Sequence, residues 1–328
     1  MNNVKVLGRT AYFNQQLAAR GNTDAFRALR LSERTALKAF EIMGHVRPQL
    51  TDASVRSKDA ACDWVTKADT AIQAEQIRSI FEEFPAHKII AEEEHDDSLR
   101  ATASDRDIWY LDGVDGTAAF ARKTVNMFGA MDYLLPDFVQ FGMQMAYLRD
   151  GKPMYAIFAA PEMNIDGLGY SIFEAVDGIE ETFLNGNRVG FAADGPLQNS
   201  LSLLSFRDEP YEDGLRQHLV SSGVTGRHVT RSVSTGSEFA MLIQRSSELN
   251  NFNLITTERE KPWDLIPGAF LIEKAGGGIR FLDGSSIFPF SLNFLGPDGR
   301  SQPVVAASLS NLSFVLSMIG SFNTERSF

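Results

Sequence analysis

The residues best suited to chemistry in this chain form the hexapeptide 112–117, Asp-Gly-Val-Asp-Gly-Thr, which follows the apolar run 108–111. Asp112 and Asp115 stand three residues apart, where a predicted strand gives way to a glycine turn and then to a helix-compatible segment. Carboxylates at a strand end bind hard cations, and amide groups at the start of a helix bind phosphate. The hexapeptide therefore indicates metal-assisted phosphate chemistry.

Both aspartates also have a purely structural explanation, because Asp-Gly turns are common and such residues are often only turn formers. The preceding run is apolar enough to be a central strand, whose end often lines a site. The main-chain carbonyl of Val114 can add a third oxygen ligand, and the N–H groups of Gly116 and Thr117 can meet a phosphate oxygen. Magnesium takes an octahedral shell of oxygens and keeps several waters, so few protein ligands suffice.

Three further carboxylates are candidates for the same site. Glu92 follows the short predicted strand Ile89-Ile90, whose end can hold it near the end of the 108–111 strand. Asp264 is predicted to start a helix, where its alternative role is an N-cap worth about 1 kcal/mol. Asp69 lies in the first turn of a helix predicted over 66–84, and its alternative role is to complement the helix dipole.

The elements that must position these residues can be read from the sequence. A capping box at Thr66, with Asp69 in place of glutamate, predicts the start of the second helix. An earlier helix is predicted after Ser32, with Pro48 ending it. Further strands are predicted over four runs: Met127–Leu135, Val139–Leu148, Met154–Ala159 and Tyr170–Val176. Asp150-Gly151 predicts a hairpin between the second and third of these.

The pattern changes beyond Asp194-Gly195-Pro196, where short strands such as 201–206 alternate with helical segments such as 238–244. We therefore expect two domains. Residues 1–192 form an N-terminal α+β domain with most of the metal ligands. Residues 193–328 form a C-terminal α/β domain that supplies Asp264 and substrate contacts.

The composition limits the classes of partner. The chain has 328 residues with a net charge of −11, which makes a nucleic-acid or anionic-membrane surface unfavourable. Cys62 is the single cysteine, so an intramolecular disulfide and a thiolate metal cluster are excluded. Apolar runs fall short of the roughly 20 residues that span a bilayer. We expect no nucleic-acid or membrane partner and a cytoplasmic location.

Four ordered motifs resemble those of the inositol monophosphatase family, which shares a superfamily with fructose bisphosphatases. The family pattern is Val-Thr-x-x-Asp, Gly-Glu-Glu, Asp-Pro-Ile/Leu-Asp-Gly-Thr, and Trp-Asp-x-Ala-Ala-Gly ahead of Glu-Ala-Gly-Gly. The matching segments here are 65–69, 91–93, 112–117, and 263–268 ahead of 273–277. The resemblance runs from about residue 33 to about residue 317, and the joint occurrence of the motifs is specific.

The resemblance implies an α+β fold of α-β-α-β-α layers, a homodimer, and magnesium-dependent hydrolysis of a small phosphorylated metabolite by direct attack of water. It also implies roles for particular residues. Glu92, Asp112 and the Val114 carbonyl would hold one Mg2+, and Asp112, Asp115 and Asp264 a second. Glu92 would reach a third ion, while Thr117 and Asp69 would position the attacking water. Phosphate and substrate contacts are expected from Asp115, Gly116, Thr117, Thr235, Gly236 and Ser237.

The sequence departs from the family pattern at four positions. Gly113 replaces the proline between the two aspartates, so φ is no longer fixed by a ring there. Ala91 replaces a glycine and Pro267 a helical alanine, while Thr257 stands where inositol phosphatases have a glutamate. The proposed ligands are all present, but the substrate-recognition part is altered. Inositol phosphate, histidinol phosphate, a sugar phosphate and a 3′-phosphonucleotide all remain candidate substrates.

Two other functions are compatible with parts of the sequence. A haloacid-dehalogenase-type phosphatase uses an aspartate nucleophile in Asp-x-Asp-Gly-Thr, but two residues separate the aspartates here, which would misplace the acid/base group. A catalytically weak or inactive family member could bind a phosphorylated ligand or a protein partner, as the changes at Gly113 and Thr257 suggest. The intact carboxylate set favours the enzyme.

Overall fold

The structure is a computed structural model of the chain. It describes the following residues: 15, 23–50, 56–57, 64–122, 141–191, 197, 201–205, 209–223, 227–230, 234–244, 252–257 and 259–326. The predicted strand 127–135 and Cys62 lie outside these residues.

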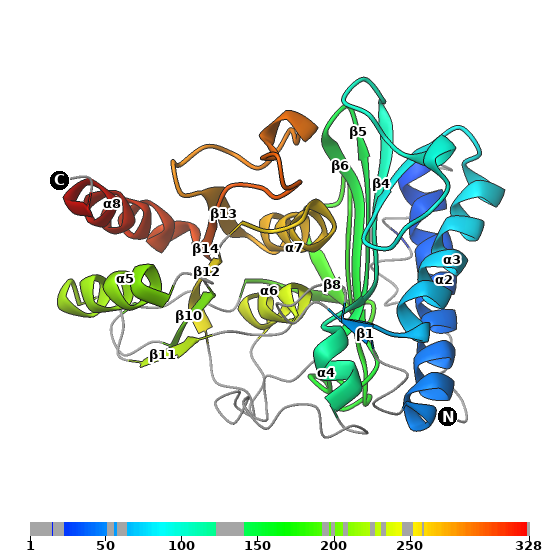
Figure 1. Cartoon of the computed structure of the whole chain (residues 1–328), viewed down its shortest axis with the longest axis horizontal. Coiled ribbons are helices and arrows are strands. Elements are labelled where there is room, and N and C mark those ends of the chain that lie inside the picture. The colour runs from blue at the N-terminus through cyan, green and yellow to red at the C-terminus, as the bar shows by residue number, and fades with distance from the viewer. Residues whose placement is uncertain are drawn as a thin grey trace.

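The described elements form five layers, as Figure 1 shows. The first layer is the helix pair α2 (Asp24–Val46) and α3 (Lys67–Glu83), which covers the larger sheet. The pair α6 (Thr235–Ile243) and α7 (Pro262–Lys274) lies between the larger and the smaller sheet. The pair α5 (Glu209–Ser221) and α8 (Leu309–Arg326) covers the far side of the smaller sheet. The predicted α-β-α-β-α arrangement is therefore confirmed. The middle helix pair contacts both sheets, so its side chains can reach a site at the edge of either sheet.

The larger sheet has seven strands in the order β3-β4-β5-β6-β7-β8-β9. Their bounds are β3 (Lys88–Ala91), β4 (Asp107–Asp115), β5 (Gly142–Arg149), β6 (Lys152–Ala160), β7 (Ser171–Val176), β8 (Thr182–Leu184) and β9 (Asn187–Val189). Only β3 and β4 pair in parallel, and the later neighbours are antiparallel. The ends of β3 and β4 that precede Glu92 and Gly116 therefore lie at the same edge of the sheet.

The smaller sheet has five strands in the order β11-β10-β12-β14-β13. Their bounds are β10 (Leu201–Ser205), β11 (Arg227–Thr230), β12 (Phe252–Thr257), β13 (Gly277–Phe281) and β14 (Val304–Ser308). A two-stranded pair, β1 (Arg56–Ser57) and β2 (Trp64–Val65), and the short helix α4 (Thr117–Arg122) complete these elements. The described residues also include three 3-10 turns: Arg47–Gln49, Asp97–Leu99 and Leu292–Phe294.

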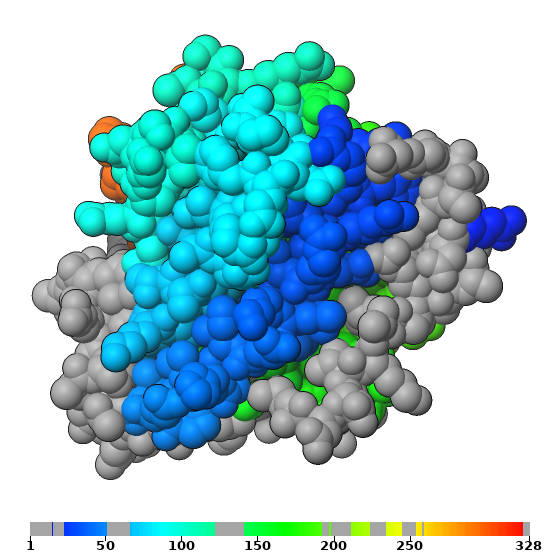
Figure 2. Space-filling model, turned by 90° about the vertical axis from the view of Figure 1, so that its right-hand side faces the viewer, coloured from blue at the N-terminus to red at the C-terminus, as the bar shows by residue number. Residues whose placement is uncertain are grey.

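The first helix begins earlier than the sequence predicts. Ser32 was expected just outside the helix, but it is buried inside α2, which starts at Asp24. The residues before Ser32 continue the apolar stripe with Phe26 and Leu29, so packing against the sheet extends the helix toward the N-terminus. Figure 2 shows α2 and α3 side by side over this face of the molecule.

The buried residues whose positions are described form three clusters. One lies between α2, α3 and the larger sheet, a second surrounds α6 and α7, and a third lies beneath α5 and α8. The second cluster contains Tyr110 from β4 as well as Leu271 from α7. It therefore joins residues from both sides of the predicted boundary near residue 193, and the division into two domains stays a prediction.

Most predicted elements match the structure. The helix over 66–84 becomes α3, capped by Thr66 and Asp69 as predicted. The Asp150-Gly151 hairpin joins β5 to β6, and both residues have positive φ (51° and 73°), as a type I′ turn requires. Among the described helices, none is both long and apolar enough to cross a bilayer.

Candidate active site

The first four residues of the hexapeptide do not form a turn, as the sequence suggested, but are the last part of β4, and the turn comes only at Gly116, just before α4. The strand runs to Asp115 instead of ending at Leu111. Asp112 pairs with Gln144 of β5 and Asp115 with Gly142, so β4 holds one more residue than β5 between these pairs. This extra residue is a β-bulge, a distortion that re-aims the neighbouring side chains.

The bulge brings three carboxylates together. Oxygen atoms of Asp112, Asp115 and Asp264 all lie within 4.8 Å of one another. Asp112 and Asp115 are almost completely buried, with 1% and 5% exposure. Asp264 comes from the first turn of α7, which begins at Pro262 with Lys261 as its N-cap. The predicted helix start at Asp264 is therefore two residues late, and Asp264 is not the N-cap.

Electrostatics marks this cluster as a place for cations. Burial raises the pKa of Asp112 and Asp264 well above the usual range, and the nearby charge of Glu92 raises both further. Burial likewise raises the pKa of Asp115 to about 7. Buried carboxylates ionise readily only when cations compensate them. Because all these groups are hard oxygen donors, the cluster fits Mg2+.

A second group of contacts joins the start of α3 to the start of α4. The hydroxyl oxygen of Thr117 lies 2.5 Å from Asp69 Oδ1 and 3.0 Å from the carbonyl oxygen of Val114. Asp69 Oδ2 accepts hydrogen bonds from the N–H and hydroxyl of Thr66, at 2.9 and 2.6 Å. Burial raises the pKa of Asp69 to about 7, although its hydrogen bonds to Thr117 and Thr66 oppose this shift.

Asp115 is fixed by the N-terminus of α6, a contact that the sequence did not predict. Its Oδ2 accepts hydrogen bonds from the Ser234 hydroxyl and the Gly236 N–H, both at 2.7 Å, and its Oδ1 accepts one from the Thr235 N–H at 3.1 Å. Ser237 instead contacts Ser234, the N-cap of α6. The predicted substrate contacts Thr235 and Gly236 thus use their amides to hold a candidate metal ligand.

Glu92 lies beside the cluster, at the end of β3. The Glu92 N–H donates to the carbonyl of Leu111 at 3.2 Å. The side chain of Gln73, from α3, bonds both backbone groups of Glu93, at 2.8 and 2.9 Å. Sequence reasoning overlooked Gln73, although a polar residue on the buried face of an amphipathic helix is a signal of this kind of contact.

The structure shows where the four residues that depart from the family pattern lie. A Cβ atom on Gly113 would lie 2.5 Å from the carbonyl oxygen of Asp69, so the close approach of α3 requires glycine there. Thr257 is fully buried at the end of β12, and Ala91 is buried at the end of β3. Pro267 lies inside α7, because that helix begins earlier than predicted.

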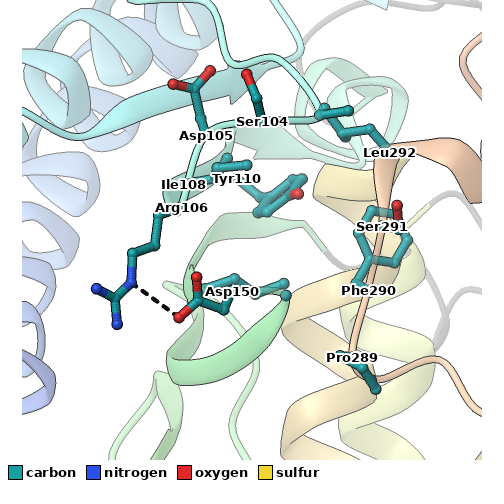
Figure 3. Close-up of a pocket in the computed structure, with 13 residues that line it drawn as sticks. Ser104, Asp105, Arg106, Ile108, Tyr110, Asp150, Pro289, Phe290, Ser291 and Leu292 are labelled. Carbon is teal, nitrogen blue, oxygen red and sulfur yellow. Dashed lines mark hydrogen bonds and ion pairs between the residues drawn. The ribbon is translucent and has the colours of Figure 1, made fainter.

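A separate cavity of about 370 Å³ lies beside the first half of β4, and Figure 3 shows the residues that line it. Ile108 and Tyr110 line it, together with residues around Phe290. The Arg106 side chain at its rim pairs with Asp150 at 2.9 Å. The convergent carboxylates therefore do not open into this cavity, and we place the candidate active site at the bulge.

Comparison with known proteins identifies the family of the chain. The model of the "Inositol monophosphatase family" matches residues 27–314. A Thermotoga maritima protein named "Fructose-1,6-bisphosphatase/inositol-1-monophosphatase" is 24% identical over 256 residues, which cover 75% of this chain and 82% of the relative. The Escherichia coli K12 protein "Nus factor SuhB" is 25% identical over 295 residues, which cover 88% of this chain and 97% of the relative.

Solved structures show the same fold. An IMPase from Thermotoga maritima superimposes with a TM-score of 0.67 at 19% identity, covering 91% of this chain and 98% of its own. An IMPase/NADP phosphatase complexed with Mg2+ and phosphate gives a TM-score of 0.67 at 17% identity, covering 90% of this chain and 96% of its own. The family match extends over most of the sequence, and the chain therefore belongs to the inositol monophosphatase family.

Proposed function

We propose that this protein is a magnesium-dependent phosphatase that hydrolyses a small phosphate monoester by direct attack of water. The observation that carries the proposal is the convergence of Asp112, Asp115 and Asp264, from two distant segments, on one point. Glu92 adds a fourth carboxylate close enough to raise the pKa of the others. A structural cluster of this kind would be strained without cations, because the burial of like charges is unfavourable.

The proposed roles are those that the family resemblance implies, and the cluster of Asp112, Asp115 and Asp264 supports them. Asp112, Asp115 and Asp264 would hold one Mg2+, and Glu92, Asp112 and the Val114 carbonyl another; a third ion near Glu92 is part of the proposal. Bound Mg2+ supplies a water of lowered pKa and offsets charge on the phosphoryl oxygens.

The protein's own proton-handling group is the pair of Thr117 and Asp69. The Thr117 hydroxyl has a single proton, so it donates to Asp69 or to the Val114 carbonyl but not to both at once. With its pKa near 7, Asp69 can take a proton that Thr117 passes on from the attacking water. The N–H groups of Gly116 and Thr117 lie next to this pair and are the proposed phosphate contacts.

The substrate class is tested by a phosphate-release screen of the purified full chain. The panel contains inositol phosphates, sugar phosphates and bisphosphates, histidinol phosphate and 3′-phosphonucleotides, each with Mg2+ and with EDTA. The proposal expects magnesium-dependent release from at least one of them. Release that is equally fast in EDTA, or no release from any compound, would contradict it.

A second candidate is a binding function, which the relatives named Nus factor SuhB favour. In that case the chain would keep the fold and the acidic centre but act through a protein or nucleic-acid partner, and our expectation of no nucleic-acid partner would fail. Pull-down with wild-type protein and an Asp115→Asn variant separates the functions, because binding through another surface would survive this change. A homodimer is also part of the proposal, and light scattering would measure it.

A further inference from the structure

The bulge in β4 interrupts the hydrogen bonds between β4 and β5 at the place where the carboxylates lie. A bulge leaves part of the hydrogen-bond ladder unpaired. The break here falls between the pairs Asp112–Gln144 and Asp115–Gly142, in a region that is almost completely buried. A buried carbonyl without a partner costs about 1–3 kcal/mol. We therefore expect another polar group to donate hydrogen bonds to the carbonyls at this break and to hold the bulge in one conformation.

Gln76 of α3 fills this break. Its side chain is fully buried, and Nε2 donates to the carbonyl of Asp112 at 3.2 Å and to the carbonyl of Gln144 at 3.1 Å. Both partners are carbonyl oxygens, so the amide nitrogen, with its two hydrogens, must face the strands. The other amide atom, Oε1, is buried and has no hydrogen-bond partner among the described residues. Within the part of the chain that the structure describes, the two donated bonds are thus the side-chain hydrogen bonds of Gln76.

These bonds approach the bulge from the side opposite to the carboxylates. α3 packs on the face of the sheet that carries Trp109 and Leu111, whereas Tyr110 belongs to the core around α7. Side chains alternate along a strand, so Asp112 faces α7 together with Tyr110. Gln76 therefore contacts the backbone carbonyl of Asp112 from the α3 side of the sheet, whereas the Asp112 carboxylate lies on the α7 side.

Gly113 gives α3 a second point of contact with the same bulge. The glycine has no positive φ, so its backbone conformation does not demand glycine. The space does, because a Cβ would lie 2.5 Å from the Asp69 carbonyl oxygen. The first turn of α3 thus packs directly against Gly113, one of the two residues between the aspartates.

We propose that Gln76 is a positioning residue of the acidic centre: together with the close contact at Gly113, it fixes the bulge so that Asp112 and Asp115 converge on Asp264. The proposal rests on the Mg2+ site of the proposed function, but it does not depend on which phosphate ester, if any, is hydrolysed there. The proposal predicts that loss of the two Gln76 bonds weakens Mg2+ binding more than it weakens the fold.

The test uses Gln76→Met in the full chain, because methionine keeps the length and helix propensity of glutamine without its donors. The matched control is Ser171→Ala, which removes another buried bond to a carbonyl, that of Met163 at 2.7 Å, far along the chain from the bulge. Calorimetry measures Mg2+ affinity, and thermal unfolding is followed in EDTA and in Mg2+. For Gln76→Met, we expect a loss of about 10- to 100-fold in Mg2+ affinity, as for other residues that orient metal ligands. Ser171→Ala should retain the wild-type affinity.

A Gln76→Met protein that is less stable in EDTA but binds Mg2+ as tightly as wild type would overturn the proposal, because Gln76 would then be only structural. If Gln76→Met does not fold, Gly113→Ala provides the same test by displacing the first turn of α3. Gly190→Ala is its control, since a Cβ there has no neighbour closer than 4.0 Å. If wild type binds Mg2+ but releases no phosphate, the proposed function fails while the inference about Gln76 can still hold.

Discussion

Among single residues, Thr117 offers the sharpest test of how the site handles protons. Thr117→Val keeps the shape of the side chain but removes the hydroxyl that contacts Asp69 and the Val114 carbonyl. We expect kcat to fall by about 10²- to 10⁴-fold, the usual contribution of a proton-transfer group. Thr117→Ser keeps the hydroxyl and should remain within about tenfold of wild type. Wild-type turnover in Thr117→Val would remove Thr117 from the proposed mechanism.

The sequence identified the carboxylates, but not how they are held. Asp112 and Asp115 were recognisable because their spacing and their motif are local. The partners of Asp115, at Ser234 and Gly236, are about 120 residues away in sequence, and the amide of Gln76 meets backbone carbonyls rather than a side chain with a recognisable pattern. Contacts of this kind depend on how two elements dock, and a single sequence gives no direct signal for them.

At the scale of elements, the position of α7 determines where Asp264 lies. α7 packs so closely on α6 that a Cβ on Gly268 would lie 1.9 Å from a ring carbon of Phe239. Gly268→Ala must therefore push the helices apart, and we expect a loss of about 1–3 kcal/mol in the free energy of unfolding and weaker Mg2+ binding. Denaturant unfolding and calorimetry measure the two effects. The open site at Gly190 again supplies the control, and an unchanged Gly268→Ala protein would contradict the observed packing.

Elements with local signals were predicted well, and those shaped by packing were not. The capping box fixed the start of α3 because its residues satisfy one another within a single turn. The start of α2 was misplaced because Ser32 resembles an N-cap, whereas the apolar stripe before it is buried by the sheet. β4 was cut short because Gly113 and two aspartates look like a turn, although pairing with β5 extends the strand through them.

At the scale of the whole molecule, the raised pKa values link stability to pH and to metal. Asp69 and Asp115 titrate near 7 in the folded chain, against a usual value of 3.8. The metal-free folded state therefore binds more protons than the unfolded state between about pH 4 and 7, so the free energy of unfolding falls as the pH rises through this window. Asp24 and Asp107 have lowered pKa values, so they change the free energy of unfolding only below this pH window.

We therefore expect metal-free protein to have a higher Tm at pH 5.5 than at pH 8. Mg2+ binds the ionised carboxylates, so it should raise the Tm more at pH 8 than at pH 5.5. Thermal unfolding in EDTA and in Mg2+ at both pH values checks this, with Ca2+ as a second hard cation. A metal-free Tm that rises from pH 5.5 to pH 8 would show that these carboxylates do not dominate the linkage.

The central claim is that the acidic centre binds Mg2+ in order to hydrolyse a phosphate monoester. The most direct measurement is the initial rate of phosphate release from the best compound of the screen, as Mg2+ is added back to EDTA-treated wild type and Asp115→Asn. Residues that merely orient metal ligands contribute about 10- to 100-fold, so the loss of a ligand carboxylate should cost more than that. Wild type should be active only with Mg2+, and Asp115→Asn should be slower by more than about 100-fold while still folded by circular dichroism. Equal rates in the two proteins, or a wild-type rate that does not depend on Mg2+, would contradict the account.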